Sequence, residues 1–254
     1  MTYRPFLLTA AIALTTLSSC RTNESYASDS DDNSRTSTEM ITQTIPAKDV
    51  RKIDTATGIK VIYTQAKNTS VTLTAPANML KYITVTAKDG ELECIRKSNS
   101  FTKSMRGVNI TVTVSSPGLT DIDVSSGGSF VAQAPINMKD SSMDIDISSG
   151  GAISIASLTA GSLDLDASSG AAAKINGLTA KTVEADASSG AAISLSDVKA
   201  TSARINASSG AALSINGAAK VANLSASSGG AVNASGLKAD NVSKSKSSGG
   251  AISF

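Results

Sequence analysis

The sequence predicts an all-β protein built as a parallel β-solenoid, a single-chain β-helix with about 20 residues per coil and irregular N-terminal coils. Ser-Ser-Gly occurs seven times after residue 124, in steps of 23, 20, 20, 20, 19 and 20 residues. Apolar and polar residues alternate between these copies, as expected for strands with one buried face. Aromatic residues make up only 3% of the 254 residues and His is absent, which suits a thin solenoid better than a globular enzyme.

One period, Ser148–Ala167, contains two short alternating strands separated by Ser-Ser-Gly at one corner and by Ser-Leu-Thr-Ala-Gly at the other. Stacking the periods places apolar residues in columns, and neighbouring residues of one column are expected to lie about 4.8 Å apart. The first column holds Ile153, Ala173, Ile193, Leu213, Val232 and Ile252. The second holds Ile155, Ile175, Leu195, Ile215, Ala234 and Phe254. The third holds Leu165, Ala185, Ile205 and Leu224.

Two other repeat architectures fit less well. Propeller blades run at roughly 40–50 residues and would need a bulky core, but the chain has no Trp. Helical repeats conflict with Gly pairs and Ser clusters every 20 residues. Right-handed winding is the default for parallel crossovers and is expected here.

The interior is Ala-rich, with Ala167, Ala187 and Ala207 in one column. Lys244 and Lys246 then fall in columns that are apolar in every earlier coil. Charge at such a position protects an exposed sheet edge, and the ring of Phe254 is expected to plug the last turn.

Residues 1–20 read as a lipoprotein signal peptide. Arg4 precedes a short apolar run that is too short to span a membrane. The run ends in Leu17-Ser18-Ser19-Cys20, which looks like a lipobox with Cys20 as the lipid attachment residue. An ordinary signal peptide with an incidental Cys is the alternative. Lipidation would anchor the chain to a membrane without spanning it.

Three further segments follow the signal peptide. Residues 21–40 form a disordered acidic and Ser-rich tether. Residues 41–115 form an irregular β region, interpreted as N-terminal coils or a cap, and a separate small domain remains the alternative. Residues 116–254 are the regular repeats. Cys94 shares a face with Leu92 and is expected to be a small buried residue.

Six strands separated by turn residues are expected in the irregular region. They are Val50–Asp54, Ile59–Thr64, Ser70–Thr74, Ile83–Ala87, Glu91–Ile95 and Val108–Val114.

The strand Gly58-Ile59-Lys60-Val61 and the turn Asp89-Gly90-Glu91-Leu92, followed by the Ser-Ser-Gly coils, resemble the head GIN domain family of adhesins. The resemblance covers roughly residues 45–254. It implies a β-solenoid in an exported protein, frequently a lipoprotein, of Gram-negative bacteria. It supplies no catalytic residues.

A column of acidic residues is the clearest polar constellation, since each lies between inward-facing residues and therefore points outward. Its candidate surface-binding members are Asp144, Asp146, Asp164, Asp166, Glu184 and Asp186. Like charges on neighbouring strands repel, so such a column is expected to have a function or to bind a counter-ion. A weak Ca²⁺ site is one interpretation. A solvated face that discourages lateral pairing is the favoured one.

The sequence therefore predicts a non-enzymatic cell-envelope lipoprotein, an adhesin or scaffold that uses a rigid solenoid face. It would be exported and lipid-anchored to the outer membrane, periplasmic or surface-exposed, with an unknown glycan or protein ligand and no cofactor. A net charge of +2 gives no bias toward nucleic acid. The Ser-rich corners form turns, since no His stands by to activate a nucleophile. A carbohydrate-active β-helix enzyme is the alternative, and flat Ser/Thr/Ala faces that order water are a third hypothesis.

Overall fold

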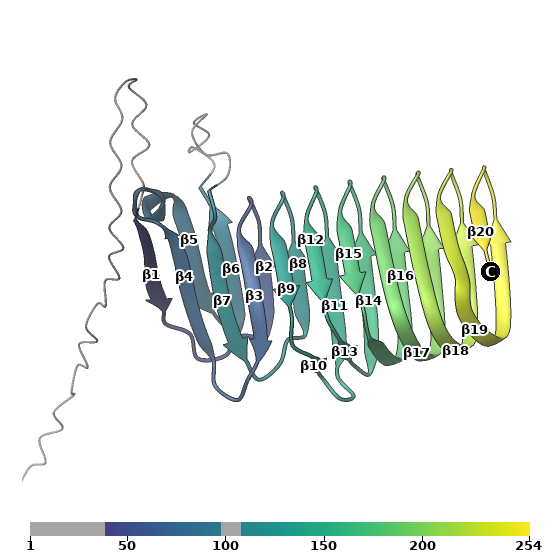
Figure 1. The fold of residues 1–254 in the computed structure, drawn as a ribbon, viewed down its shortest axis with the longest axis horizontal. Helices are drawn as coiled ribbons and strands as arrows, with labels where there is room; N and C mark the ends of the chain where they lie inside the picture. Colours follow the sequence, from purple (N-terminus) through teal and green to yellow (C-terminus); the bar gives the residue numbers. More distant parts are fainter. Residues whose placement is uncertain (1–38, 98–107) are drawn as a thin grey trace, which may run out of the picture. The chain divides into compact units, whose positions relative to one another are not determined.

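The structure is a computed structural model that describes residues 39–97 and 108–254. Cys20, the signal peptide and nearly all of the tether lie outside the described residues. Residues 38–254 form one compact unit, a parallel β-solenoid of about seven turns with about 20 residues per turn (Figure 1). The predicted fold class is confirmed.

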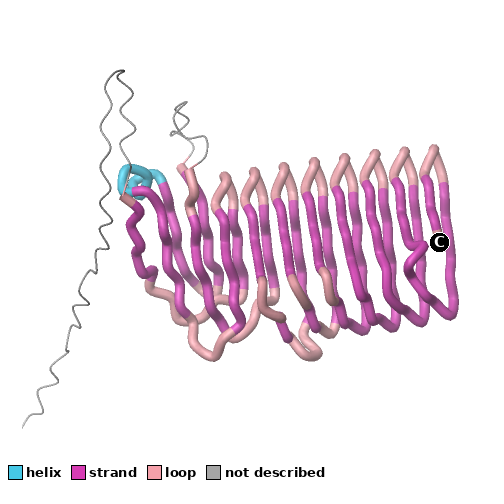
Figure 2. Tube along the Cα trace, in the orientation of Figure 1, coloured by secondary structure: helices cyan, strands magenta, loops and turns pink. Residues whose placement is uncertain are grey.

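The strands of the irregular region lie close to the expected positions, with one additional strand before them. They are β1 (Met40–Ile45), β2 (Lys52–Thr55), β3 (Lys60–Gln65), β4 (Ser70–Pro76), β5 (Ile83–Lys88), β6 (Glu91–Arg96) and β7 (Thr111–Ser116), with a short 3₁₀ helix, η1 (Ala77–Tyr82), after β4. Figure 2 shows that the described helix lies at this end of the stack.

The regular coils contain the remaining strands. They are β8 (Asp121–Val124), β9 (Ser129–Ala132), β10 (Ile136–Asn137), β11 (Ser142–Ile147), β12 (Ala152–Ile155), β13 (Leu158–Thr159), β14 (Ser162–Ala167), β15 (Ala172–Ile175), β16 (Leu178–Ala187), β17 (Ala192–Ala207), β18 (Ala212–Ala226), β19 (Ala231–Lys246) and β20 (Ala251–Ser253). Those from β16 to β19 are long because they continue around the corner opposite Ser-Ser-Gly.

Each regular coil contributes to three faces. The acidic sheet contains β8, β11, β14 and the C-terminal parts of β16 to β19. The alanine sheet contains β9, β12, β15, β20 and the N-terminal parts of β17 to β19. A narrow face, formed by β10, β13 and the segments of β16 to β19 that continue them, joins the two sheets opposite the Ser-Ser-Gly corners.

The registers confirm the first and third apolar columns along their whole length. The third column continues from Leu224 to Lys244, as the sequence indicated. The expectation for Phe254 is wrong in part. Strand β20 ends at Ser253, and the Phe254 side chain stays 45% exposed instead of filling the turn. The Lys244 ammonium lies 5.2 Å from the centre of its ring.

The order of the coils at the N-terminal end differs from their order in the chain. Strand β2 pairs in parallel with β8 on one side and with β6 on the other. Strand β3 is likewise flanked by β9 and β7. The coil made by β6 and β7 therefore lies outside the coil made by β2 and β3, although it comes later in the sequence. Antiparallel strands then cover this end, with β4 on β7, β1 on β4 and β5 on β6.

The Ser-Ser-Gly corners are tight turns in which two residues have positive φ. In the copy that begins at Ser148, Ser149 has φ 49° and Gly150 has φ 73°, and the Gly151 amide donates to the Ser148 carbonyl at 2.8 Å. These features match a type I′ turn. The Gly150 amide also donates to the Ser169 carbonyl of the next corner at 3.1 Å. Hydrogen bonds along the axis therefore join the corners, which supports their structural role.

Cys94 is buried in the core, as expected. Burial, together with the nearby carboxylates of Asp54 and Glu93, raises the pKa of its thiol to about 12. Such a thiol is unreactive. Among the described residues, no helix is long and apolar enough to cross a bilayer.

Candidate functional site

The six acidic residues singled out in the sequence lie on the outer surface of the acidic sheet, in two parallel rows. Asp144, Asp164 and Glu184 are register partners in one row, and Asp146, Asp166 and Asp186 are partners in the other. Asp121 and Asp123 continue the rows by one coil. Neighbouring members lie about 4.8 Å apart, the spacing of paired strands. The rows are called the acidic stripe below.

The acidic stripe also extends into the irregular region, which the sequence did not predict. Lys52 and Asp54 of β2 pair with Asp121 and Asp123 of β8, and Glu91 and Glu93 of β6 follow on the far side of β2. The alternating patterns Lys-Ile-Asp and Glu-Leu-Glu could have indicated this face. Their place in the stack could not be read, because the coils are not stacked in chain order.

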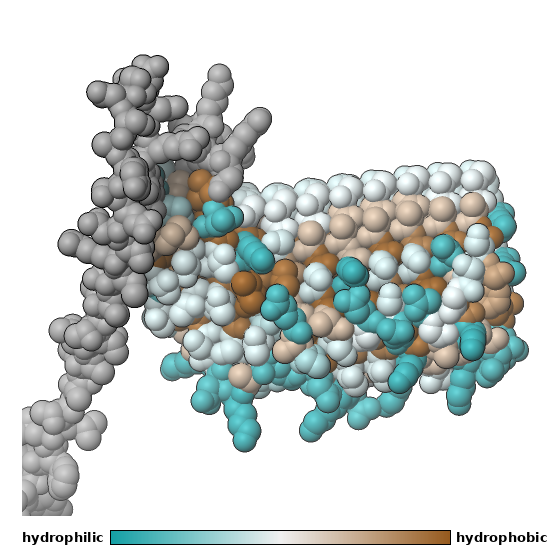
Figure 3. Space-filling model, in the orientation of Figure 1, coloured by the Kyte–Doolittle hydropathy of each residue, from teal (hydrophilic) through white to brown (hydrophobic). Residues whose placement is uncertain are grey.

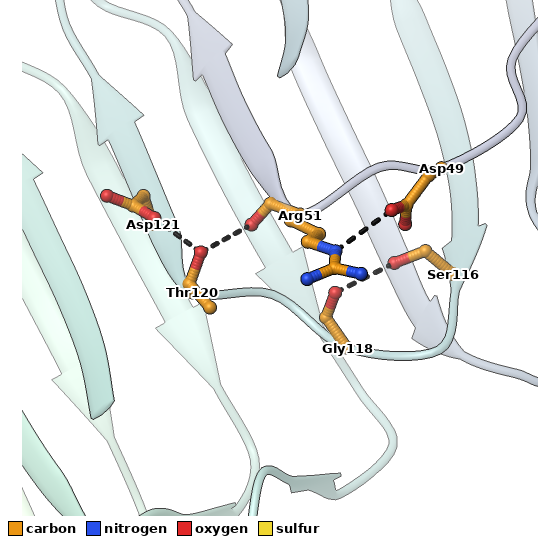
Figure 4. Close-up of polar contacts among 6 residues, drawn as sticks. All are labelled: Asp49, Arg51, Ser116, Gly118, Thr120 and Asp121. Atoms are coloured by element: carbon orange, nitrogen blue, oxygen red, sulfur yellow. Dashed lines mark hydrogen bonds and ion pairs between the residues drawn. The ribbon is translucent and has the colours of Figure 1, made fainter. Parts of the chain in front are cut away.

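A polar junction joins β2 to β8 at the start of the stripe (Figure 4). The Thr120 amide donates to the Arg51 carbonyl at 2.8 Å, and the Thr120 hydroxyl contacts that carbonyl and the Asp121 carboxylate. Arg51 itself pairs with Asp49 at 2.9 Å. Lys52 reaches across to Asp121, with 2.9 Å between Nζ and Oδ1. The stripe is therefore partly neutralised at this end.

Five carboxyl groups of the stripe have a raised pKa for the same two reasons. Partial burial raises their pKa, and the neighbouring carboxylates raise it further. They are Asp54, Asp123, Asp146, Asp164 and Asp166. Asp121 differs: burial alone would raise its pKa, but hydrogen bonds from Thr120 and Lys52 and the Lys52 charge lower it overall.

The carboxylates stand side by side and do not converge. Within residues 39–97 and 108–254, no three Asp, Glu, His or Cys side chains are grouped so that they could hold a metal ion. The arrangement therefore gives no further support to the interpretation of the stripe as a Ca²⁺ site.

The charge of the stripe ends at Arg204 and Asn206. Arg204 Nε lies 3.5 Å from Glu184 Oε1, and Asn206 Nδ2 donates to Asp186 Oδ1 at 2.7 Å. The next coils present the shorter side chains of Asn223, Ser225, Ser243 and Ser245. The shortening leaves a shallow hollow of about 320 Å³ with carboxylate, guanidinium, amide and hydroxyl groups around it, which can exchange hydrogen bonds with a hydroxyl-rich ligand.

The alanine sheet presents a second regular surface, and its row of alanines was not predicted from the sequence. Its outward row next to the corners is alanine in six successive coils: Ala152, Ala172, Ala192, Ala212, Ala231 and Ala251. Figure 3 shows this weakly hydrophobic row along the margin of the Ser-Ser-Gly corners. The residue two places after Ser-Ser-Gly is alanine in the last six copies and Ser129 in the first, so the sequence contains a marker of this row.

Comparison with known proteins gives the same fold. The family model described as "putative auto-transporter adhesin, head GIN domain" matches residues 49–216 and again 165–254. The chain belongs to this family. The resemblance seen in the sequence is thereby confirmed.

Solved structures of low identity share the fold. A "putative adhesin" from Bacteroides fragilis has a TM-score of 0.73 at 21% identity, over 84% of this chain and 96% of that one. A "putative lipid binding protein" from Parabacteroides distasonis has a TM-score of 0.68 at 16% identity, over 84% and 95%. A "putative adhesin" from Parabacteroides merdae has a TM-score of 0.60 at 18% identity, over 85% and 96%. No curated protein matches the sequence.

Proposed function

We propose that this chain is a non-enzymatic, lipid-anchored adhesin of the cell envelope. Family membership supports an adhesin-like role in an exported protein. The observation that carries the proposal is the acidic stripe, whose carboxylates repeat at one spacing along a single face. Repeated identical contacts on a rigid support favour multivalent binding, in which many weak contacts give high avidity.

The same observation argues against the enzyme alternative. A glycosidase places two carboxyl groups on opposite sides of the bond it cleaves and gives them different pKa values. Here Asp146 and Asp166 are neighbours on one sheet, and the same two causes raise the pKa of both. Neither group is set apart as the acid or the base.

The contact surface that we propose is the acidic stripe from Asp144 to Asp186, together with the hollow beside Arg204 and Asn206. The ligand would offer hydroxyl groups to the hollow and cationic or hydroxyl groups to the stripe, which fits a glycan on a partner surface. The anchor would be Cys20, with residues 21–40 giving the solenoid reach beyond the membrane.

Two experiments test this function. The first labels intact cells with an amine-reactive reagent that cannot cross membranes, because surface display would expose the many lysines of the solenoid. Labelling of wild-type protein, and loss of the membrane-bound fraction in Cys20→Ala, are the expected results. Protein that is labelled only after lysis would contradict surface display.

The second experiment places the full-length protein, solubilised in detergent, on a glycan array. Asp164→Asn/Asp166→Asn should lose binding. The matched control is Asp89→Asn/Asp197→Asn, since both residues are exposed and have positive φ, which Asn tolerates. Equal binding by the two double variants would show that the stripe is not the contact surface.

A further inference from the structure

The narrow face opposite the Ser-Ser-Gly corners carries a groove that the proposed function does not use. Its floor is a row of one alanine per coil: Ala160, Ala180, Ala200, Ala219 and Ala239. Threonine and lysine side chains form most of its two walls, and Ala218 and the acidic Asp240 complete them near the C-terminal end. The groove has a volume of about 690 Å³, and hydrophilic side chains gather along this margin in Figure 3. It is called the lysine groove below.

The lysines follow a rule that the register reveals. The wall before the alanine row carries Lys199 and Lys238, which stand two coils apart with Ala218 between them. The wall after the row carries Lys139, Lys181 and Lys220, which follow Met138, Ala180 and Ala219 and are also two coils apart. The wall after the row therefore has a lysine at every second coil, whereas the wall before it follows this rule only from Lys199 on, since Thr159 and Thr179 come first. Successive lysines of one wall lie about 10 Å apart, and the two walls are out of phase.

Most of these charges lack a partner within the described chain. Lys181 Nζ pairs with Asp140 Oδ1 at 2.7 Å, reaching over the coil that carries Gly161. Among the described residues, no ion pair forms at Lys139, Lys199, Lys220 or Lys238, and all four are exposed. Three successive coils thus present Lys199, Lys220 and Lys238 on alternate sides of an apolar floor.

The shape of the groove and the residues that line it exclude several classes of anionic partner. The groove is concave, so a flat bilayer would touch only the tips of its walls. No arginine or aromatic side chain lines it, although nucleic-acid sites rely on both for phosphate contacts and base stacking. The backbone amides of the narrow face already bond along the axis, which leaves none to pair with an added peptide strand.

An extended acidic polysaccharide meets the remaining conditions. In such a chain successive sugars turn to opposite sides, so a polymer of alternating uronic acid and neutral sugar carries its carboxylates on one side, one per disaccharide, which suits the lysine spacing of one wall. We propose that the lysine groove binds a linear glycan of this class, which lies along the solenoid axis with its sugar rings over the alanines and its carboxylates at the lysines of one wall. This site lies on a different face from the acidic stripe and does not depend on it.

The test measures binding of a hyaluronan octasaccharide to full-length protein in detergent, by calorimetry at low and moderate salt. Lys199→Gln/Lys220→Gln should weaken binding at least about fivefold, and added salt should weaken the wild type more than the variant. Lys174→Gln, an exposed lysine on the alanine sheet, is the control and should bind as the wild type does. Unchanged affinity in the double variant would overturn the proposal.

A charge-conserving variant separates spacing from simple attraction. Thr201→Lys/Lys220→Thr keeps the number of lysines but places two of them on adjacent coils of one wall. We expect the affinity of this variant for the octasaccharide to fall as in the double variant, while its Tm stays near that of the wild type. Wild-type affinity in this variant would overturn the proposal. So would equal or tighter binding of dextran, oligothymidylate or phosphatidylglycerol vesicles.

Discussion

Two regions, residues 39–97 with 108–116 and residues 125–254, build coils of the same stack from different side chains. In the first region the largest buried groups include Tyr63, Ile53 and Leu92, and the Tyr63 ring stacks on Phe130 at 5.9 Å. In the second region alanine fills many inward positions, such as Ala185 and Ala187. The irregular region thus relies on side-chain volume, and the regular region relies on exact repetition of backbone contacts.

The difference shows which of the two regions depends on an exact repeat of its coils. A buried Tyr requires a specific partner, which Ser116 supplies through its carbonyl and hydroxyl oxygens at 3.1 and 3.2 Å. Because specific side-chain contacts of this kind hold the irregular region together, it can include loops and antiparallel strands. An alanine core offers little apolar area per coil, so each coil must dock on its neighbours in one register. We expect the two regions to respond differently to substitution.

The largest effect is expected for Ile175→Asp in the regular region. Ile175 is fully buried between Ile155 and Leu195, and an unpaired buried charge there should cost more than about 4 kcal/mol. Because each coil contacts only its neighbours, hydrogen exchange should show loss of protection in coils on both sides. The control Lys174→Asp, one residue away and exposed, should change the free energy of unfolding by no more than about 0.5 kcal/mol. An unchanged melting curve for Ile175→Asp would refute the assigned column.

A smaller effect is expected where the two regions meet. The first column runs from Val61 through Phe130 and Ile153 to Ala173, so one column passes from a large core to a small one. Phe130→Ala should cost about 4 kcal/mol, since it removes the stacking partner of Tyr63 and leaves a cavity. Ile193→Ala should cost about 2 kcal/mol, because its neighbour in the preceding coil, Ala173, is already small. Urea titration would measure both, and equal losses would contradict the comparison.

The regular region could be predicted almost residue by residue, and the irregular region could not. Alternation fixes which side chains point inward, and the Ser-Ser-Gly period fixes the register, so the columns of Ile153 and Leu165 follow directly. Insertion of β2 between β6 and β8 depends on contacts between distant residues, and nothing in the sequence of Lys52–Thr55 marks its two neighbours. For the same reason, the sequence revealed the acidic stripe only from Asp121 onward.

The lysine groove illustrates a second limit. The sequence shows the lysines but not the walls, because the copies of the repeat differ in length by one residue at Gly217 and the walls appear only after Lys199 is aligned with Ala218 and Lys238. Charge of one sign on alternate coils is also a sensible way to avoid repulsion between neighbours. The acidic stripe does not follow that rule, and there like charge adds to burial in raising the pKa of Asp123, Asp146, Asp164 and Asp166.

The third effect is the dependence of stability on pH. Burial and like charge raise the pKa of Asp146 and Asp166 in the folded chain, so the folded state binds protons more tightly than the unfolded state. Stability should therefore increase as the pH falls from 7 through these raised values toward the usual Asp pKa near 4. Solvent screens these exposed groups, so each should contribute less than about 1 kcal/mol.

Thermal melts at pH 7 and pH 5 would measure this change. Asp146→Asn/Asp166→Asn should be more stable than the wild type at pH 7 and should show a flatter dependence on pH. Asp121 and Asp140, whose pKa is lowered by pairing, act in the opposite direction only at more acidic pH. A wild-type Tm that falls between pH 7 and pH 5 would contradict the assignment.

The smallest effect compares the same turn in the two regions. Ser189-Gly190 and Thr57-Gly58 both have two successive positive φ angles, 50° and 75° in the first and 55° and 75° in the second. Asn tolerates this conformation better than Ser or Thr, so Ser189→Asn should gain about 0.5 kcal/mol. Thr57→Asn should gain less, because the Thr57 hydroxyl accepts a hydrogen bond from the Arg96 amide at 2.8 Å. Paired urea titrations would decide: a larger gain at Thr57 would mean that strain, and not this individual contact, sets the stability of turns in the irregular region.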